Sequence, residues 1–244
     1  MMVRKGYCVE LQVCNYDEIF DLQMTLNRAR QQGVIPDILL LLEHQPCFTI
    51  GRNKDSLNHL LVDQEVLDEH HIKIFESNRG GDITYHGPGQ IICYPIIALT
   101  GANKDVHAFS RKMEELLIRT LIYFDILAVR KQEYPGVWVE DRKIGALGIA
   151  IRKWVTMHGV SLNVCPNLMH FSFIVPCGIT SLGVTSMAQI LDTVDSKAVR
   201  SQLRKEFEEL FEIETELVSV DRIKEMVCGY AETSVVSCTS TQSR

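Results

Sequence analysis

The spacing of apolar residues along the chain predicts a mixture of strands and helices. Pro36 and Asp37 precede the apolar run 38–42, which is too short for a helix and is typical of a buried strand. Pro95 excludes a helix around the apolar stretch 91–97. The predicted strands are Gly6–Cys14, Ile38–Leu42, Ile72–Glu76, Ile91–Ile97, Ile126–Val129, Gly136–Glu140, Lys143–Ile151 and Val155–Val164.

Helical periodicity marks four further segments. Asn15 or Asp17 can cap a helix that runs to about Gln32 and ends at Gly33. In the last predicted helix, apolar residues recur every three or four positions and form an inner side. The predicted helices are 15–32, Asp63–His70, Val106–Phe124 and Ser196–Phe211, the last with Val199, Leu203, Phe207, Leu210 and Phe211 on its inner side.

The order of these elements indicates an α+β fold, a mixed sheet flanked by helices. Strands and helices do not alternate regularly, as they would in a doubly wound parallel sheet. Residues 79–89 are expected to form a loop, because they are rich in glycine and proline. After Tyr230 the chain becomes rich in serine and threonine. We therefore expect one domain over residues 1–230 and a disordered tail over 231–244.

Composition narrows the class of protein. The 244 residues are 46% hydrophobic and 23% charged, as in ordinary soluble proteins, and no apolar run approaches the roughly 20 residues that span a membrane. A formal charge of −6 disfavours nucleic-acid binding. The eight cysteines form no Cys-x-x-Cys pair, so neither a zinc site nor a disulfide framework is expected. Because the N-terminus resembles neither a signal nor a transit peptide, we expect a cytoplasmic protein, with an organelle matrix as the alternative. We also expect a monomer with no membrane or nucleic-acid partner.

The segment RGGDITYHGPGQ, residues 79–90, has the most unusual composition. Four glycines and Pro88 surround the polar residues Arg79, Asp82, Thr84 and His86. Glycines let the backbone approach a ligand closely, whereas the alternative is a tight surface turn in which Arg79 pairs with Asp82. No Gly-Lys-Ser/Thr closes the segment, which excludes a phosphate-binding loop of the Walker type.

Three other segments carry candidate chemistry. Lys143 begins a strand after a predicted hairpin turn at Glu140 and Asp141, and it is either a solvated edge residue or an amine held in a dry site. Cys177 lies between Pro176 and Gly178, and it is either a packed thiol or a nucleophile presented at a rigid turn. His158, within HGVSLN, is more typical of a core histidine than of a catalyst.

Together these segments resemble the lipoyl(octanoyl) transferase family. The resemblance covers about residues 6–212, and the second and last segments are very close to the family signature. The matching segments, in chain order, are LLEHQPCFTIG (41–51), RGGDITYHGPGQ (79–90), GVWVEDRKIGALG (136–148), HGVSLN (158–163) and IVPCGI (174–179). Ser161 departs from a frequent alanine of the family, and it bears on chain length if it faces the acyl site.

The resemblance implies a fold like the catalytic domain of biotin and lipoate protein ligases. It implies octanoyl transfer from an acyl carrier protein to a lysine of lipoyl domains, in 2-oxoacid dehydrogenases and the glycine cleavage system, without a cofactor or metal. Cys177 would be the nucleophile and Lys143 its acid/base partner. The implied acyl-site residues are Arg79, Gly80, Gly81, Asp82, Ile83, Thr84, Tyr85, His86, Ala146, Leu147, Gly148, Gly159, Val160 and Ser161.

Other activities remain open from the sequence. An ATP-dependent lipoate or biotin ligase of the same fold would use the lysine without a thiol, and a lipoyl amidotransferase would use another donor. A non-catalytic carrier-binding module would lack the thiol or the lysine. A cysteine hydrolase would need a histidine base, for which His86 and His158 are the candidates.

Overall fold

A large mixed sheet forms the centre of the molecule. The structure, a computed structural model, describes residues 3–175 and 182–228. Within these residues the strand order is β12-β1-β2-β6-β10-β9-β8-β7, with β11 paired to β9. β12, β1 and β2 run parallel, whereas β2, β6, β10, β9, β8 and β7 pair antiparallel in turn. The strands are β1 Arg4–Cys14, β2 Asp37–His44, β6 Gln90–Ile96, β7 Val129–Arg130, β8 Val137–Val139, β9 Arg142–Arg152, β10 Val155–Asn163, β11 Gly183–Val184 and β12 Ile213–Leu217.

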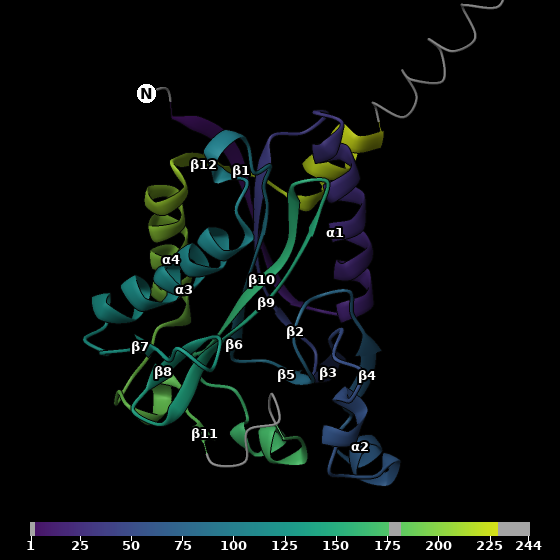
Figure 1. Cartoon of the computed structure of the whole chain (residues 1–244), viewed down its shortest axis with the longest axis vertical. Helices are drawn as coiled ribbons and strands as arrows, with labels where there is room; N and C mark the ends of the chain where they lie inside the picture. The colour runs from purple at the N-terminus through teal and green to yellow at the C-terminus, as the bar shows by residue number, and fades with distance from the viewer. Residues whose placement is uncertain (1–2, 176–181, 229–244) are drawn as a thin grey trace, which may run out of the picture.

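Helices cover both faces of this sheet. Helix α1 (Tyr16–Gln31) lies on one face, and helices α3 (Val106–Tyr123) and α4 (Ser196–Phe211) lie together on the other (Figure 1). The side chains of Asp105 and Asp195 accept backbone hydrogen bonds at the starts of α3 and α4, which satisfies donors that the first helical turn leaves unpaired. The predicted α+β class, with a mixed sheet flanked by helices, is confirmed.

Strand β2 is buried on both faces. Leu39 and Leu41 pack into the core under α3 and α4, whereas Ile38, Leu40 and Leu42 pack into the core under α1. Successive side chains of a strand point to opposite faces, so a strand between two helical layers needs an apolar residue at every position. This explains the unbroken run of apolar residues that predicted the strand.

A small second sheet lies beside the large one. Its strands lie in the order β4 (Lys73–Glu76), β3 (Cys47–Ile50) and β5 (Thr84–His86). Helix α2 (Gln64–Glu69) lies between β3 and β4 in the sequence. A third apolar cluster supports this sheet and includes Phe48, Ile72, Tyr85 and Phe171. Pairing with β3 therefore positions residues 84–86 in the small sheet.

Several sequence predictions were wrong in detail. Residues 84–86 were expected in a loop but form β5, because their backbone pairs with β3 despite the neighbouring glycines. Residues 126–129 were expected to be a strand, yet only Val129 belongs to β7. Strands β3 and β12 and the helical residues 220–228 were not predicted. The alternation Ile-Glu-Thr-Glu-Leu in β12 was the missed signal. The predicted tail, 231–244, lies outside the described residues.

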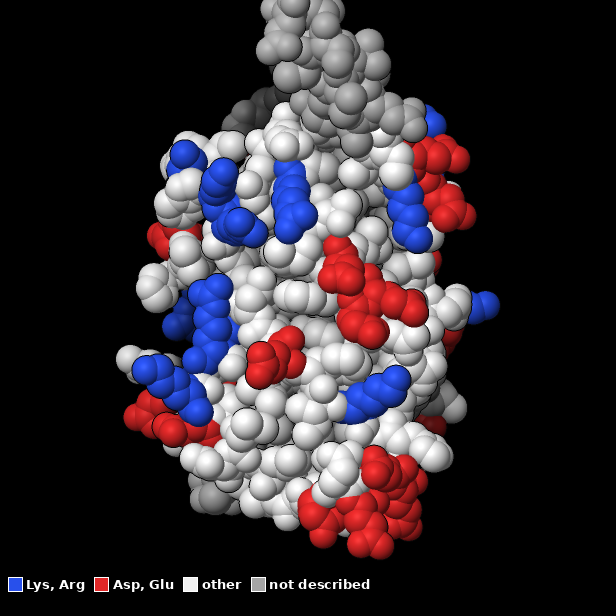
Figure 2. Space-filling model, turned by 90° about the vertical axis from the view of Figure 1, so that its right-hand side faces the viewer, with Lys and Arg blue, Asp and Glu red and all other residues white. Residues whose placement is uncertain are grey.

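The surface carries charges of both signs. On the face that holds α1 and α2, basic and acidic side chains are interspersed (Figure 2). Helix α2 contributes the exposed acidic residues Glu65, Asp68 and Glu69, and helix α1 contributes Asp17, Glu18 and Asp21. Among the helices that the structure describes, each is too short or too polar to cross a membrane.

Candidate active site

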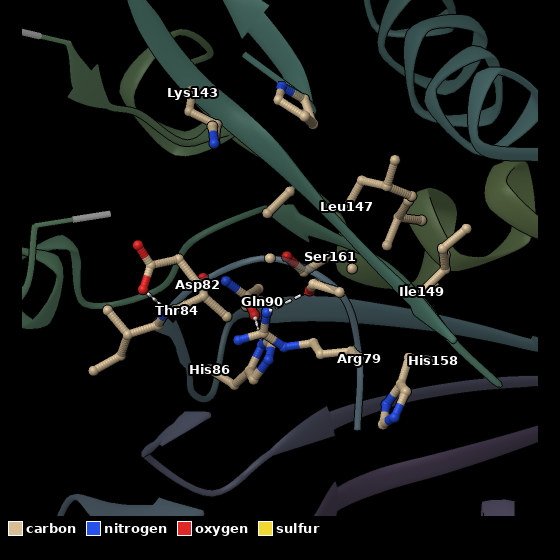
Figure 3. Close-up of a pocket in the computed structure, with 18 of the residues that line it drawn as sticks. Arg79, Asp82, Thr84, His86, Gln90, Lys143, Leu147, Ile149, His158 and Ser161 are labelled. Carbon is tan, nitrogen blue, oxygen red and sulfur yellow. Dashed lines mark hydrogen bonds between the residues drawn. The ribbon is translucent and has the colours of Figure 1, made fainter. Parts of the chain in front are cut away.

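A cavity of about 650 Å³ lies between the small sheet and the β9–β10 hairpin. Lys143 lies toward one end of the group of lining residues and His158 toward the other, with Arg79, His86 and Gln90 between them (Figure 3). The predicted residues that line it are Arg79, Gly80, Gly81, Asp82, Ile83, Thr84, His86, Lys143, Ala146, Leu147, Gly148, Gly159, Val160 and Ser161. Segments from distant parts of the sequence thus meet around one cavity.

Lys143 lies near the start of β9, paired with Trp138 of β8 and with Val184 of β11. The side chain is buried, with 8% of the residue exposed, and its Nζ lies 4.8 Å from the centre of the Trp138 ring. The backbone oxygen of Lys143 accepts a hydrogen bond from the Thr185 N–H at 2.9 Å. The solvated edge position that the sequence left open is therefore excluded, and Lys143 is a buried amine facing the cavity.

Arg79 is buried and anchored to β3. Its Nη2 donates to the backbone oxygen of Thr49 at 2.6 Å and to Thr49 Oγ1 at 2.9 Å, and its Nη1 donates to the oxygen of Gly80 at 3.1 Å. Pairing with Asp82, the surface-turn alternative, is not among these contacts. These contacts fix the guanidinium in the wall of the cavity.

Glycines allow the polar loop to approach its neighbours. A side chain at Gly51 would place its Cβ 2.2 Å from the oxygen of Gly81, and one at Gly148 would place its Cβ 2.8 Å from Arg79 Cδ. The first contact brings residues 79–82 against the chain that follows β3. The second lets Arg79 lie across β9, so these glycines are required by packing.

A hydrogen-bond chain runs from His86 toward Lys143. His86 Nδ1 donates to Gln90 Oε1 at 2.7 Å, and Gln90 Nε2 donates to Asn163 Oδ1 at 2.9 Å. Asn163 Nδ2 donates to the backbone oxygen of Thr185 at 3.0 Å, and Thr185 N–H bonds to the oxygen of Lys143. The chain fixes the side-chain orientations across the base of the cavity.

Burial holds three histidines neutral, His86 and His158 in the cavity wall and His44 beside His86. Burial lowers the pKa of His44 to about 4, and burial near Arg79 lowers the pKa of His158 to about 3. Burial, together with His44, holds the pKa of His86 well below its usual value. His86 Nε2 faces Thr49 Oγ1 at 3.4 Å, so both of its nitrogens contact protein groups. This arrangement favours an orienting role for His86.

Cys177 lies outside the described residues, which end at Val175 on its N-terminal side. The chain that leads to it is tied to the cavity loop. Val175 N–H donates to the oxygen of His59 at 2.8 Å, and His59 Nδ1 lies 2.6 Å from Asp82 Oδ2. The approach to Cys177 is therefore anchored, through His59, to a residue that lines the cavity.

Tyr85 does not line the cavity. It is buried on the other side of β5, where its hydroxyl contacts His170 Nδ1 at 2.8 Å and its ring packs on Phe48. Neighbouring strand residues point to opposite faces, so Thr84 and His86 face the cavity and Tyr85 cannot. Residues that the motif matches did not assign to the acyl site also line it: Arg52, Asn53, Gln90, Tyr94, Pro135, Ile149, His158, Asn163, Phe171 and Val184.

Most of these additions had no signal in the sequence, because their positions depend on tertiary packing. Ile149 is an exception, since it continues the β9 stretch that follows Gly148. Gln90, His158 and Asn163 lie within the matched segments. In the part of the chain that the structure describes, no group of three or more His, Cys, Asp or Glu side chains is arranged to hold a metal ion.

Comparison with known proteins places this geometry in a family. A family model described as the lipoyl protein ligase A/B catalytic domain matches residues 15–208. Octanoyltransferases of Desulforamulus reducens and Caldanaerobacter subterraneus are 41% and 40% identical over 225 and 221 residues. Each covers 91% of this chain, and the matches cover 98% and 96% of the relatives.

Solved structures share the fold. Protein Ta0514 of T. acidophilum, with bound lipoic acid, has a TM-score of 0.75 at 17% identity, and the match covers 94% of this chain and 95% of that one. Lipoate-protein ligase A bound with ATP has a TM-score of 0.75 at 18% identity, with 92% and 93% covered. The fold predicted from the family resemblance is confirmed. The chain belongs to the lipoyl protein ligase A/B catalytic domain family and, as its similarity to the octanoyltransferases shows, is an acyltransferase of that family.

Proposed function

We propose that this chain transfers an octanoyl group from octanoyl-acyl carrier protein to a specific lysine of lipoyl domains, through a thioester on Cys177. The observation that carries the proposal is the buried Lys143 in a cavity whose β9–β10 wall includes Ala146, Leu147, Ile149 and Val160. A cavity of about 650 Å³ is within the range of small-ligand sites. The similarity to octanoyltransferases supports octanoyl as the transferred group.

In the first half-reaction, the Cys177 thiolate attacks the carbonyl carbon of the donor thioester. The carrier's sulfur leaves and takes a proton from the Lys143 ammonium, which becomes neutral. The products are acyl-Cys177 and the free thiol of the carrier. Lys143 is buried beside Trp138, so its ammonium is held in place as the proton donor of this step.

In the second half-reaction, the acceptor lysine arrives as an ammonium. Neutral Lys143 takes one proton, the amine attacks the acyl-Cys177 carbonyl, and the second amine proton leaves to solvent as the amide forms. The Cys177 thiolate is released, and Lys143 is again an ammonium. Arg79 places its positive charge in the wall of the acyl cavity, and His86 holds Gln90 in place.

The acceptor class is proposed from the family. A bipartite lipoate protein ligase from Thermoplasma acidophilum, described together with its E2 lipoyl domain, has a TM-score of 0.70 to this chain at 19% identity. A thioester donor and an amine acceptor need no nucleotide, because conversion of a thioester to an amide is downhill. We further propose that the enzyme works as a cytoplasmic monomer without a cofactor.

Intact-mass spectrometry tests the covalent step. After incubation with octanoyl-carrier protein, the wild type should gain one octanoyl group, and Cys177→Ala should gain none and lose transfer. Cys228→Ala, which removes an exposed thiol at the far end of the described chain, is the matched control and should behave as wild type. Comparable transfer by Cys177→Ala would exclude the thioester. Dependence on ATP would indicate a ligase, and use of lipoyl-protein donors would indicate an amidotransferase.

A further inference from the structure

Two lysines share the ring of Trp138. Lys143 Nζ lies 4.8 Å from the ring centre, and Lys131 Nζ lies 5.5 Å from it. Only 1% of Trp138 is exposed, so the ring is shielded from water. An ammonium within about 6 Å of an indole face is attracted by the ring's electron density, and the attraction grows when water is excluded.

The ring of Trp138 is fixed in place. Its Nε1 donates to the backbone oxygen of Tyr134 at 3.1 Å, and the Tyr134 ring packs against it at 6.1 Å between centroids. Trp138 also lies directly opposite Lys143 in the pairing of β8 with β9. The indole face is therefore presented to Lys143 by the sheet register as well as by a hydrogen bond.

Helix α3 anchors the strand that carries this ring. The buried Glu114 accepts a hydrogen bond from the Gly136 N–H at 3.1 Å and pairs with Arg130 Nε at 3.2 Å. Gly136 immediately precedes β8, where the pairing with β9 shifts between Val137 and Trp138. Glu114 thus fixes the position of Gly136 at the start of β8, and β8 in turn positions the Trp138 indole.

The second cation has its own carboxylate. Lys131 Nζ lies 2.5 Å from Asp141 Oδ1, so its charge is largely compensated at the surface. Lys143 faces the cavity, which Pro135, Ala146 and Val184 also line. The two ammonium groups consequently meet the same ring in different surroundings, and the inner one is the group that faces an acyl ligand.

We propose that Trp138 is a positioning residue, whose indole face holds the Lys143 ammonium at the reacting end of the cavity. This rests on the proposed function, in which Lys143 gives up and regains a proton. Trp138 touches no substrate atom; it restricts Nζ to the place from which a proton reaches the leaving sulfur. The competing interpretation is that Trp138 only fills space in the core.

Fluorinated tryptophans separate these two roles. Added fluorine atoms weaken the electron density of the ring step by step while they change its shape little. The chain has two tryptophans, so Trp154→Phe yields a protein whose single tryptophan is Trp138. We expect log kcat to fall in proportion to the number of fluorines, by about tenfold from none to four, while KM stays constant. A role confined to packing leaves kcat flat.

Trp154 supplies a matched control. Lys104 Nζ lies 5.7 Å from its ring, at the β9–β10 turn and away from the cavity lining. In the reciprocal Trp138→Phe background, fluorination of Trp154 should not change kcat. Trp138→Phe itself should keep more activity than Trp138→Leu, because phenylalanine retains an aromatic face.

A readout independent of turnover completes the test. In the Trp154→Phe background, Lys143→Met should shift the emission of Trp138, since the ring loses the ammonium at its face. Unchanged emission together with a flat fluorine series would overturn the proposal. Failure of the proposed function would appear differently, as the absence of an octanoyl adduct on the wild type, while the emission shift would persist.

Discussion

The Thr49 hydroxyl oxygen accepts two hydrogen bonds from the Arg79 guanidinium, from Nε at 3.2 Å and from Nη2 at 2.9 Å. Its remaining proton points to His86, because His86 Nδ1 is the donor to Gln90 and Nε2 must accept. One hydroxyl thus joins the arginine of the cavity wall to the buried histidine. All of its hydrogen-bonding capacity is used.

The Thr49→Val variant tests this junction. It keeps the shape of the side chain but removes the hydrogen bonds that Thr49 Oγ1 makes with Arg79 Nε and His86 Nε2. We expect the free energy of unfolding, measured in urea, to be about 1–3 kcal/mol lower than in the wild type. We also expect kcat to fall by a larger factor than KM rises. Thr49→Ser keeps the hydroxyl and should stay near wild type in kcat. Equal loss in both variants would contradict the hydrogen-bond account.

The Lys143→Met variant tests the proton carrier. Methionine retains the length of the side chain and removes the amine, so we expect kcat to fall by about 10²- to 10⁴-fold at pH 7. Lys153→Met, at the exposed turn between β9 and β10, is the matched control. Single-turnover measurements of acyl-enzyme formation would locate the loss. Normal turnover by Lys143→Met would remove the lysine from the mechanism.

The buried histidines predict acid sensitivity. The pKa values of His44 (about 4) and His158 (about 3) lie below the ordinary value of about 6.5 for the unfolded chain. Between pH 6.5 and 4 the unfolded chain therefore binds more protons than the folded chain. Stability is complete above pH 6.5 and falls as the pH is lowered, by up to about 1.4 kcal/mol per histidine for each pH unit.

Urea unfolding at pH 7.5 and pH 5.5 measures this slope. His44→Gln should reduce the difference in unfolding free energy between the two pH values, since one buried titrating group is removed. His107→Gln, at an exposed position on α3, is the control and should leave the difference unchanged. An unchanged slope in His44→Gln would show that another group governs the acid response.

Ser161, one of the expected departures from the family pattern, lines the cavity. Ser161→Leu should fill part of the acyl space and shift the preference from octanoyl toward hexanoyl donors. Each buried methylene contributes about 0.8 kcal/mol, so losing room for two carbons weakens octanoyl by up to about 15-fold. Ser201→Leu on the exposed side of α4 is the control. An unchanged ratio of rates for the two donors would show that the end of the acyl chain does not lie beside Ser161.

Sequence patterns predicted many of the residues that line the cavity, but few of the residues that hold those side chains in place. The glycine-rich segment stood out by its composition alone, whereas the roles expected for Lys143 and Ser161 came from the family resemblance. Tyr85 was misplaced because a motif gives order along the chain without the face of the strand. Thr49 and Trp138 could not be assigned roles, since their partners Arg79 and Lys143 become neighbours only when strands pair. The assignment of Cys177 remains a prediction.

The hairpin of β9 and β10 has one further consequence. Lys143 and the wall residue Ile149 lie on the same strand, six residues apart, which corresponds to about 20 Å of extended chain. Inserting or deleting one amino acid between them would point every later side chain of β9 to the opposite face of the sheet. Relatives of this enzyme should therefore diversify their cargo by exchanging side chains along the hairpin, while the hairpin itself keeps a constant length.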